Sequence, residues 1–186
     1  YCDVVGSWTG HNVPIANMLH LYVITGPLKE LIDLAPELPV VRDVLSLARA
    51  LLHAGDRTAW LSVLRAPFCG LTLGDLHQLC GHDPQMLLIE CLADSSLVSK
   101  LSPDGQLRLA RCTPLLLKSF EGRRRDHLAN CVESLWRQLG GPAACRDIAD
   151  LDAARRFLLA LREEEQSGPL DGDRLEALAL RLRAGS

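Results

Sequence analysis

The strongest chemical feature of the sequence is a basic segment near its middle. Between Lys100 and Arg125 seven cations stand against two acids, although the whole chain carries a formal net charge of -3. Positions 108, 111 and 118 share one face of a helix, and that face leads into three consecutive arginines. A cluster of this kind suits phosphates, because each neutralised phosphate releases condensed counterions. The segment predicts either contact with a DNA backbone or a solvated helix face with a basic turn; its candidate residues are Arg108, Arg111, Lys118, Arg123, Arg124 and Arg125.

A second, weaker candidate for DNA contact is the pair Gly70 and Thr72. Thr72 offers a hydroxyl and opens a predicted helix, whose N-terminus attracts anions. Gly70 permits a close approach of the backbone to phosphate, and the alternative is that it only makes the turn.

Signatures of catalysis are missing from the sequence. A P-loop needs a Gly-Lys dipeptide, and the chain contains none; it also lacks the G-x-S-x-G pattern of an activated serine. His77, Cys80 and His82 are possible zinc ligands by type, but a closed site needs four, so buried cysteine and surface histidine are the simpler interpretation. We therefore predict no catalytic residue, no metal site and no cofactor on this chain.

The elements that must position these residues are predicted to be helices. In 40–52 apolar residues recur at the helical spacing, and Gly55 is suited to the left-handed position after that helix. Asp56 and Thr72 are the predicted caps of the next two helices. Pro114 predicts a kink or break in a long helix that Ser102 caps. The further predicted helices span 84–94, 103–120, 125–139 and 150–166, with a short piece at 143–148 and a last helix from Asp171 or Asp173.

These patterns predict an all-α fold, an irregular bundle of about eight helices over residues 37–186. The composition fits, because aromatic residues are only 4% and leucine dominates the apolar positions. Residues 1–36 are rich in glycine and proline, and 19–26 have the composition of a strand. We treat 1–36 as an N-terminal arm of uncertain structure that includes this candidate short strand.

Cysteine usage and hydropathy bear on the compartment. The chain has seven cysteines, an odd number, and no C-x-x-C pattern. This usage is typical of a reduced protein in which cysteine serves as a small apolar residue. Because no signal peptide or long apolar run occurs, we expect a cytoplasmic protein without a membrane partner.

Three segments in order resemble the 2B subdomain of UvrD/Rep-type superfamily 1 DNA helicases, in a proteobacterial branch of ATP-dependent exonuclease or RecB-like proteins. They are ELPVVRD at 37–43, LLHAGDRTAWLSVLRAPFCGL at 51–71 and ESLWRQLGGPAACRDIADLDAARRFLLALREEE at 133–165. The resemblance covers residues 37–186. It implies an accessory subdomain cut from a larger enzyme, since the chain ends about where the family resumes with its next motor motif.

The resemblance also implies a function. The parent would be a hydrolase that unwinds DNA in repair or recombination, with ATP and Mg²⁺ held by its motor domains. This domain would touch duplex or forked DNA or regulate the motor. In the family a Gly-Ile-Gly-type hairpin approaches phosphate, and Gly70-Leu71-Thr72 keeps only its first glycine. The alternative function is a helical module that docks a partner subunit, which predicts an exposed apolar patch.

Overall fold

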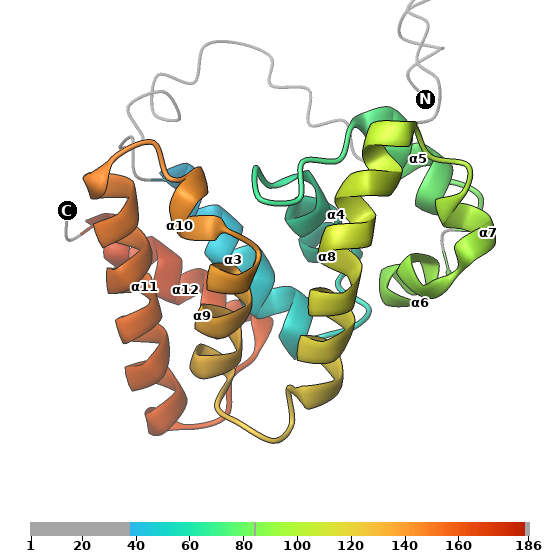
Figure 1. Ribbon diagram of the computed structural model, residues 1–186. Coiled ribbons are helices and arrows are strands. Elements are labelled where there is room, and N and C mark those ends of the chain that lie inside the picture. The colour runs from blue at the N-terminus through green and yellow to red at the C-terminus, as the bar shows by residue number, and fades with distance from the viewer. Residues whose placement is uncertain (1–37, 84, 185–186) are drawn as a thin grey trace, which may run out of the picture. The chain divides into compact units, whose positions relative to one another are not determined.

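The computed structural model describes residues 38–83 and 85–184, and within these ranges the chain is all-α, as predicted (Figure 1). The described residues form ten helices and no strand. Two of the helices have only four residues, so the estimate of about eight was close. The arm predicted at 1–36 lies outside the described residues. The helices are α3 (Leu38–Leu52), α4 (Arg57–Arg65), α5 (Leu73–Cys80), α6 (Leu88–Ala93), α7 (Ser95–Val98), α8 (Pro103–Gly122), α9 (Leu128–Gln138), α10 (Gly141–Ala144), α11 (Ile148–Ser167) and α12 (Gly172–Ala184).

Helix α3 lies at the centre of the bundle. It packs against α4, α9, α11 and α12, and Figure 1 shows it in blue and cyan between α9 and α4. Leu47 and Ala50 are buried together with Val44, Ala48 and Leu51. The sequence pattern had indicated a narrower apolar stripe. The stripe is wider because helices cover α3 from more than one side.

A smaller group of helices, α5, α6 and α7, packs beside α4 and α8. The buried carboxylate of Asp75 joins this group to α8. It accepts hydrogen bonds from the Thr72 hydroxyl at 2.7 Å, the Ser102 backbone N–H at 2.8 Å and the Ser102 hydroxyl at 3.1 Å. Thr72 and Ser102 are the N-caps of α5 and α8, so one side chain fixes the starts of both helices.

Three of the predicted N-cap residues are confirmed. Asp56 accepts a hydrogen bond from the Ala59 N–H, and Thr72 and Ser102 cap their helices as expected. The prediction for Gly55 was wrong. Its φ is not positive, and its N–H instead donates to the His53 ring nitrogen Nδ1 at 3.1 Å.

Four other boundaries differ from the prediction. The short helix expected over 143–148 spans Gly141–Ala144. The helix expected over 84–94 spans only Leu88–Ala93, because the Asp83 side chain bonds the Gln85 N–H in a local turn. Helix α9 starts at Leu128 instead of Arg125. Asp150 is not the cap of α11; Asp147 is, and Asp150 lies buried in the first turn with Arg146 bonded to its carboxylate.

Helix α8 runs without a break through Pro114, so the break allowed for at this position does not occur. The proline lies on an exposed part of the helix. Water can therefore reach the carbonyl that loses its hydrogen bond. The continuous helix holds three of the six predicted DNA-binding cations, Arg108, Arg111 and Lys118, and the other three follow directly after its last residue.

Candidate nucleic-acid interface

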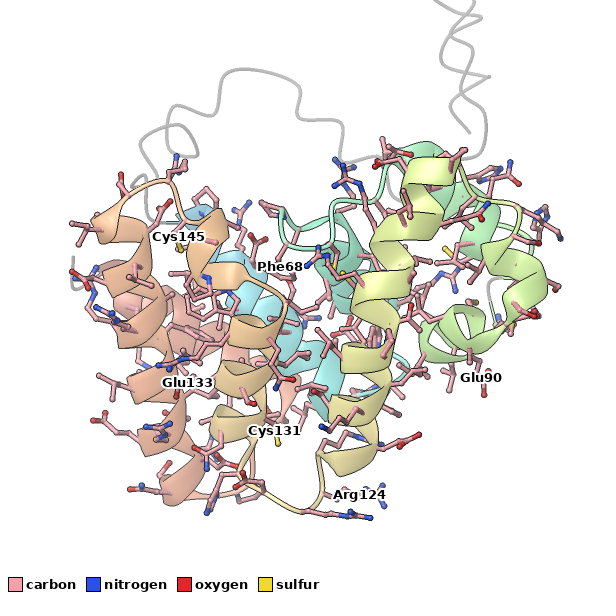
Figure 2. The ribbon with its side chains drawn as sticks, viewed as in Figure 1. Phe68, Glu90, Arg124, Cys131, Glu133 and Cys145 are labelled. Carbon is pink, nitrogen blue, oxygen red and sulfur yellow. The ribbon has the colours of Figure 1, made fainter. Side chains whose placement is uncertain are left out.

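The predicted cations follow α8 from its first turns into the connection to α9. They fall into two groups, one at each end of the helix. The first group is Arg108 and Arg111, near the loop that carries Phe68 and Gly70; the second is Lys118 and Arg123 to Arg125. In Figure 2, Phe68 lies beside the upper part of α8 and Arg124 lies at its lower end.

Arg108, in the first group, has partners within the fold. Its Nε donates to the Asp104 carboxylate at 2.6 Å, one helical turn earlier. Its guanidinium also lies against the Cα of Gly70, where an added Cβ would collide with it. Gly70 and Arg108, two of the residues predicted from the sequence, thus lie side by side. The Asp104 carboxylate, however, already neutralises the charge of Arg108.

Arg111 serves as a clamp between three parts of the chain. Its guanidinium donates to the carbonyl of Leu139 at 3.0 Å and to the carbonyl of Phe68. These bonds tie α8 to the loop before α5 and to the end of α9. Because two of its donor groups are occupied, Arg111 has fewer left for a phosphate.

The backbone around Gly70 is also used internally. Gly70 has a φ of 71°, a conformation that favours glycine, and its N–H donates to the Ala66 carbonyl at 2.7 Å. The Leu71 N–H donates to the Leu64 carbonyl at 2.9 Å, and the Thr72 hydroxyl donates to Asp75. In this conformation the N–H groups of residues 70 and 71 point into the protein and not toward a ligand.

Arg123, at the other end of α8, is the C-cap residue of the helix. Its guanidinium stacks on the Phe120 ring at 3.5 Å from the centroid and donates to the Phe120 carbonyl. Phe120 in turn packs edge-on against Trp60, with ring centroids 5.8 Å apart. Burial, followed by the charge of Arg124, lowers the pKa of Arg123 from its usual value. The Arg123 side chain is therefore occupied by contacts within the fold.

Lys118, Arg124 and Arg125 differ from the other predicted cations. All three are exposed, and none of their side chains forms a hydrogen bond or an ion pair within the part of the chain that the structure describes. Arg124 points away from the helices in Figure 2. We call these three residues the free cations of α8.

A hollow of about 430 Å³ lies between the ends of α3, α8 and α11, and Arg124 is the one free cation among its lining residues. Cations and acids both line it, so it is not a simple anion pocket. Its lining residues are Leu51, Leu52, Arg123, Arg124, Asp126, Leu128, Glu165, Gly168, Pro169 and Leu170.

Sequence reasoning missed the role of the acidic run 163–165, which resembles a solvated helix end. Glu165 instead caps α9 from another helix, since its carboxylate accepts from the Leu128 N–H at 2.7 Å and the Ala129 N–H at 3.3 Å. Glu164 pairs with Arg174 and Arg181, each at 2.5 Å, and these arginines lower the pKa of its carboxyl. These partners lie on α9 and α12, which pack against α11, so the sequence around residues 163–165 does not indicate them.

No group of three or more His, Cys, Asp or Glu side chains within the described ranges is arranged to hold a metal ion. No helix among the described residues is long and apolar enough to cross a lipid bilayer.

Comparisons with protein-family models, with curated proteins and with solved structures found no match for this chain. The resemblance to the 2B subdomain of UvrD/Rep-type helicases therefore stays a prediction from the sequence.

Proposed function

We propose that this chain is a 2B-like accessory domain of an ATP-dependent DNA helicase or exonuclease, and that it contacts duplex or forked DNA through the end of α8. By the resemblance, ATP and Mg²⁺ would be bound by the motor domains of the parent protein, which would act in the cytoplasm in DNA repair or recombination. The domain itself would supply no catalytic residue.

The observation that carries the proposal is the set of free cations of α8. A phosphate contact needs a positive side chain that is exposed and not already neutralised. Lys118, Arg124 and Arg125 meet both conditions, within the last turns of one helix and the connection after it. The other predicted residues, Arg108, Arg111, Arg123, Gly70 and Thr72, have internal partners, so we assign them a supporting role.

The test is binding of the full chain to a labelled forked duplex at several salt concentrations. We expect weak binding that falls steeply as salt rises. The triple variant Lys118→Ala/Arg124→Ala/Arg125→Ala should bind less tightly, and the slope of log affinity against log salt should decrease by about 2–3 as three phosphate contacts are lost.

A matched control variant removes three positive charges at other positions of the surface. Arg42, Arg65 and Lys100 are also exposed and form no ion pair within the described residues. The variant Arg42→Ala/Arg65→Ala/Lys100→Ala therefore changes the net charge equally. Equal losses of binding in both variants would mean that net charge alone acts, and absence of binding at low salt would refute direct DNA contact.

The alternative, a module that docks a partner subunit, rests on a different feature. Five large apolar side chains are more than half exposed, at separate positions on α5, α8, α11 and α12: Leu73, Leu107, Ile148, Leu159 and Leu180. Docking would become the better proposal if the chain bound no DNA and substitution of these residues by serine released it from the motor domains of its parent.

A further inference from the structure

A second hollow, of about 450 Å³, lies between α3 and α4. Residues 53–56 join these two packed helices, so the start of α3 and the end of α4 both lie away from this connection (Figure 1). The lining residues of both helices recur at the helical spacing; they include 42, 45, 46 and 49 on α3 and 58, 62, 65 and 66 on α4. The hollow is therefore a groove that follows one face of each helix.

Two unpaired arginines line the end of this groove that lies away from the connection. Arg42 is near the start of α3, and Arg65 is the last residue of α4. Both are exposed, and neither side chain forms a hydrogen bond or an ion pair within the described residues. Arg49, closer to the connection, is occupied by Asp56 at 2.7 Å and by Glu176. The groove thus offers unneutralised positive charge at one end.

A carboxylate that lacks a donor lies in the same groove. Asp43 is half-buried, and its side chain accepts no hydrogen bond from any residue that the structure describes. Burial raises the pKa of this carboxyl to about 6. Because a buried acceptor needs a donor, a ligand with N–H groups would satisfy Asp43. A DNA backbone has no N–H group, and the carboxylate would repel its phosphates.

Apolar side chains complete the groove. Leu45 on α3 and Ala59 and Ala66 on α4 line it, and Pro39 and Pro67 lie at the end that carries the unpaired arginines. Such a surface favours contact with an aliphatic side chain, which is then removed from water. The stretch from 42 to 49 on α3 is about 10 Å long, the length of three or four residues of extended chain.

We propose that the groove between α3 and α4 binds a short acidic peptide segment of a partner protein. Carboxylates of the segment pair with Arg42 and Arg65, and a backbone N–H donates to Asp43. An aliphatic side chain of the segment lies on Leu45 and Ala59. A peptide matches the cations, the acceptor and the apolar wall, whereas a nucleic acid matches the cations alone. The proposal goes beyond DNA contact at α8 and does not depend on it.

The test is an array of hexapeptides that carry two glutamates and two leucines in every order, with glycine at the remaining positions. The full chain is applied to the array, and the affinity of the best binder is then measured by fluorescence polarisation. We expect this peptide to bind more tightly than its counterpart with glutamine in place of glutamate. Arg42→Ala/Arg65→Ala should weaken its binding about tenfold, because two exposed ion pairs are lost.

Asp43→Ala separates a peptide site from a simple anion site. It should weaken binding of the peptide about threefold, because the hydrogen bond from the peptide backbone is lost. At an anion site the same change would tighten binding, since it removes a negative charge. Heteronuclear NMR of the full chain locates the peptide, and we expect the amide signals of Leu45, Ser46, Thr58 and Ser62 to shift.

Lys100→Ala/Arg155→Ala is the matched control. Both residues are exposed and lie outside the groove, so this variant lowers the net charge equally and should keep the affinity for the peptide. Circular dichroism checks that every variant is folded. The proposal is overturned if no glutamate peptide binds more tightly than its glutamine counterpart, if Asp43→Ala tightens binding, or if forked duplex DNA displaces the peptide. It is also overturned if the chain forms dimers that Arg42→Ala/Arg65→Ala dissociates, since a second copy would then occupy the groove.

Discussion

The two ends of α8 use the same residue types in opposite ways. At its N-terminal end, Arg108 pairs with Asp104, Arg111 holds two carbonyls and Asp75 binds the caps of two helices. At its C-terminal end, Lys118, Arg124 and Arg125 are exposed and have no ion pair within the described residues. The first end is locked to its neighbours, and the second is open to a ligand.

The difference teaches that a count of cations does not locate a binding surface. All six predicted cations are equivalent in the sequence. In the structure, an arginine near unpaired carbonyls or an acid is used by the fold, because buried acceptors need donors. Only the cations left over by the fold are available to phosphate, so the predictions below compare the two ends.

The largest effect is expected from Asp75→Ala, at the locked end. Burial alone would raise the pKa of Asp75, but hydrogen bonds from Thr72 and Ser102 lower it, so the buried side chain is a well-bonded carboxylate. Its loss leaves the Ser102 N–H without its acceptor and should reduce the free energy of unfolding by about 3 kcal/mol. Urea unfolding followed by circular dichroism measures this.

Asp104→Ala is the control for Asp75→Ala. Asp104 is 63% exposed and pairs only with Arg108, so its removal should change the free energy of unfolding by less than about 0.5 kcal/mol. A loss below about 1 kcal/mol for Asp75→Ala would mean that α5 and α8 are not held together through this carboxylate.

Two glycines of α8, one at each end, give a second comparison. A Cβ at Gly105 would lie 2.7 to 2.9 Å from the Asp75 carboxylate, whereas a Cβ at Gly122 would meet nothing within 4 Å. Gly105→Ala should destabilise the fold by about 1–2 kcal/mol through overpacking. Gly122→Ala should stabilise it by up to about 0.5 kcal/mol through helix propensity.

The sign of each change can be read from the midpoint of thermal unfolding, with Tm lower for Gly105→Ala and equal or higher for Gly122→Ala. If both variants shift Tm in the same direction, close packing at the locked end is not the reason for glycine at 105.

Much of the fold could be predicted from the sequence, because the periodicity of α3, α9 and α11 and the caps at Asp56, Thr72 and Ser102 depend on neighbouring residues. The boundaries that failed depend on distant partners. Asp150 looks like a helix cap by position, but the fold buries it and pairs it with Arg146, leaving the cap to Asp147.

The candidate site was predictable only as a list of residues. Sequence spacing placed Arg111 and Lys118 on one helix face, and it could not show that the carbonyls of Phe68 and Leu139 lie beside Arg111. These carbonyls belong to a loop and a helix end far away in the chain. The same holds for Glu165, whose partners are the N–H groups that start α9.

The last prediction concerns the pH dependence of stability that Asp43 causes beneath the locked end. Asp43 lies on α3 and lines a hollow of about 450 Å³ with Arg42, Arg49 and Arg65. Burial raises the pKa of Asp43 to about 6. The folded state therefore binds a proton on this carboxyl more tightly than the unfolded chain does, so the ionised group destabilises the fold above pH 6.

Asp43→Asn removes this penalty and should stabilise the fold at pH 7 by on the order of 1 kcal/mol, a value reduced because water reaches the hollow. The advantage should shrink as the pH falls from about 6 and vanish near pH 4, where Asp43 is protonated in both states. Urea unfolding of wild type and variant at pH 4, 5, 6 and 7 measures the difference, and Glu121→Gln at the open end of α8, exposed, should show no such trend. If the free energies of unfolding of wild type and Asp43→Asn differ by the same amount at every pH, the Asp43 carboxylate is solvated. Its ionisation would then not destabilise the locked end.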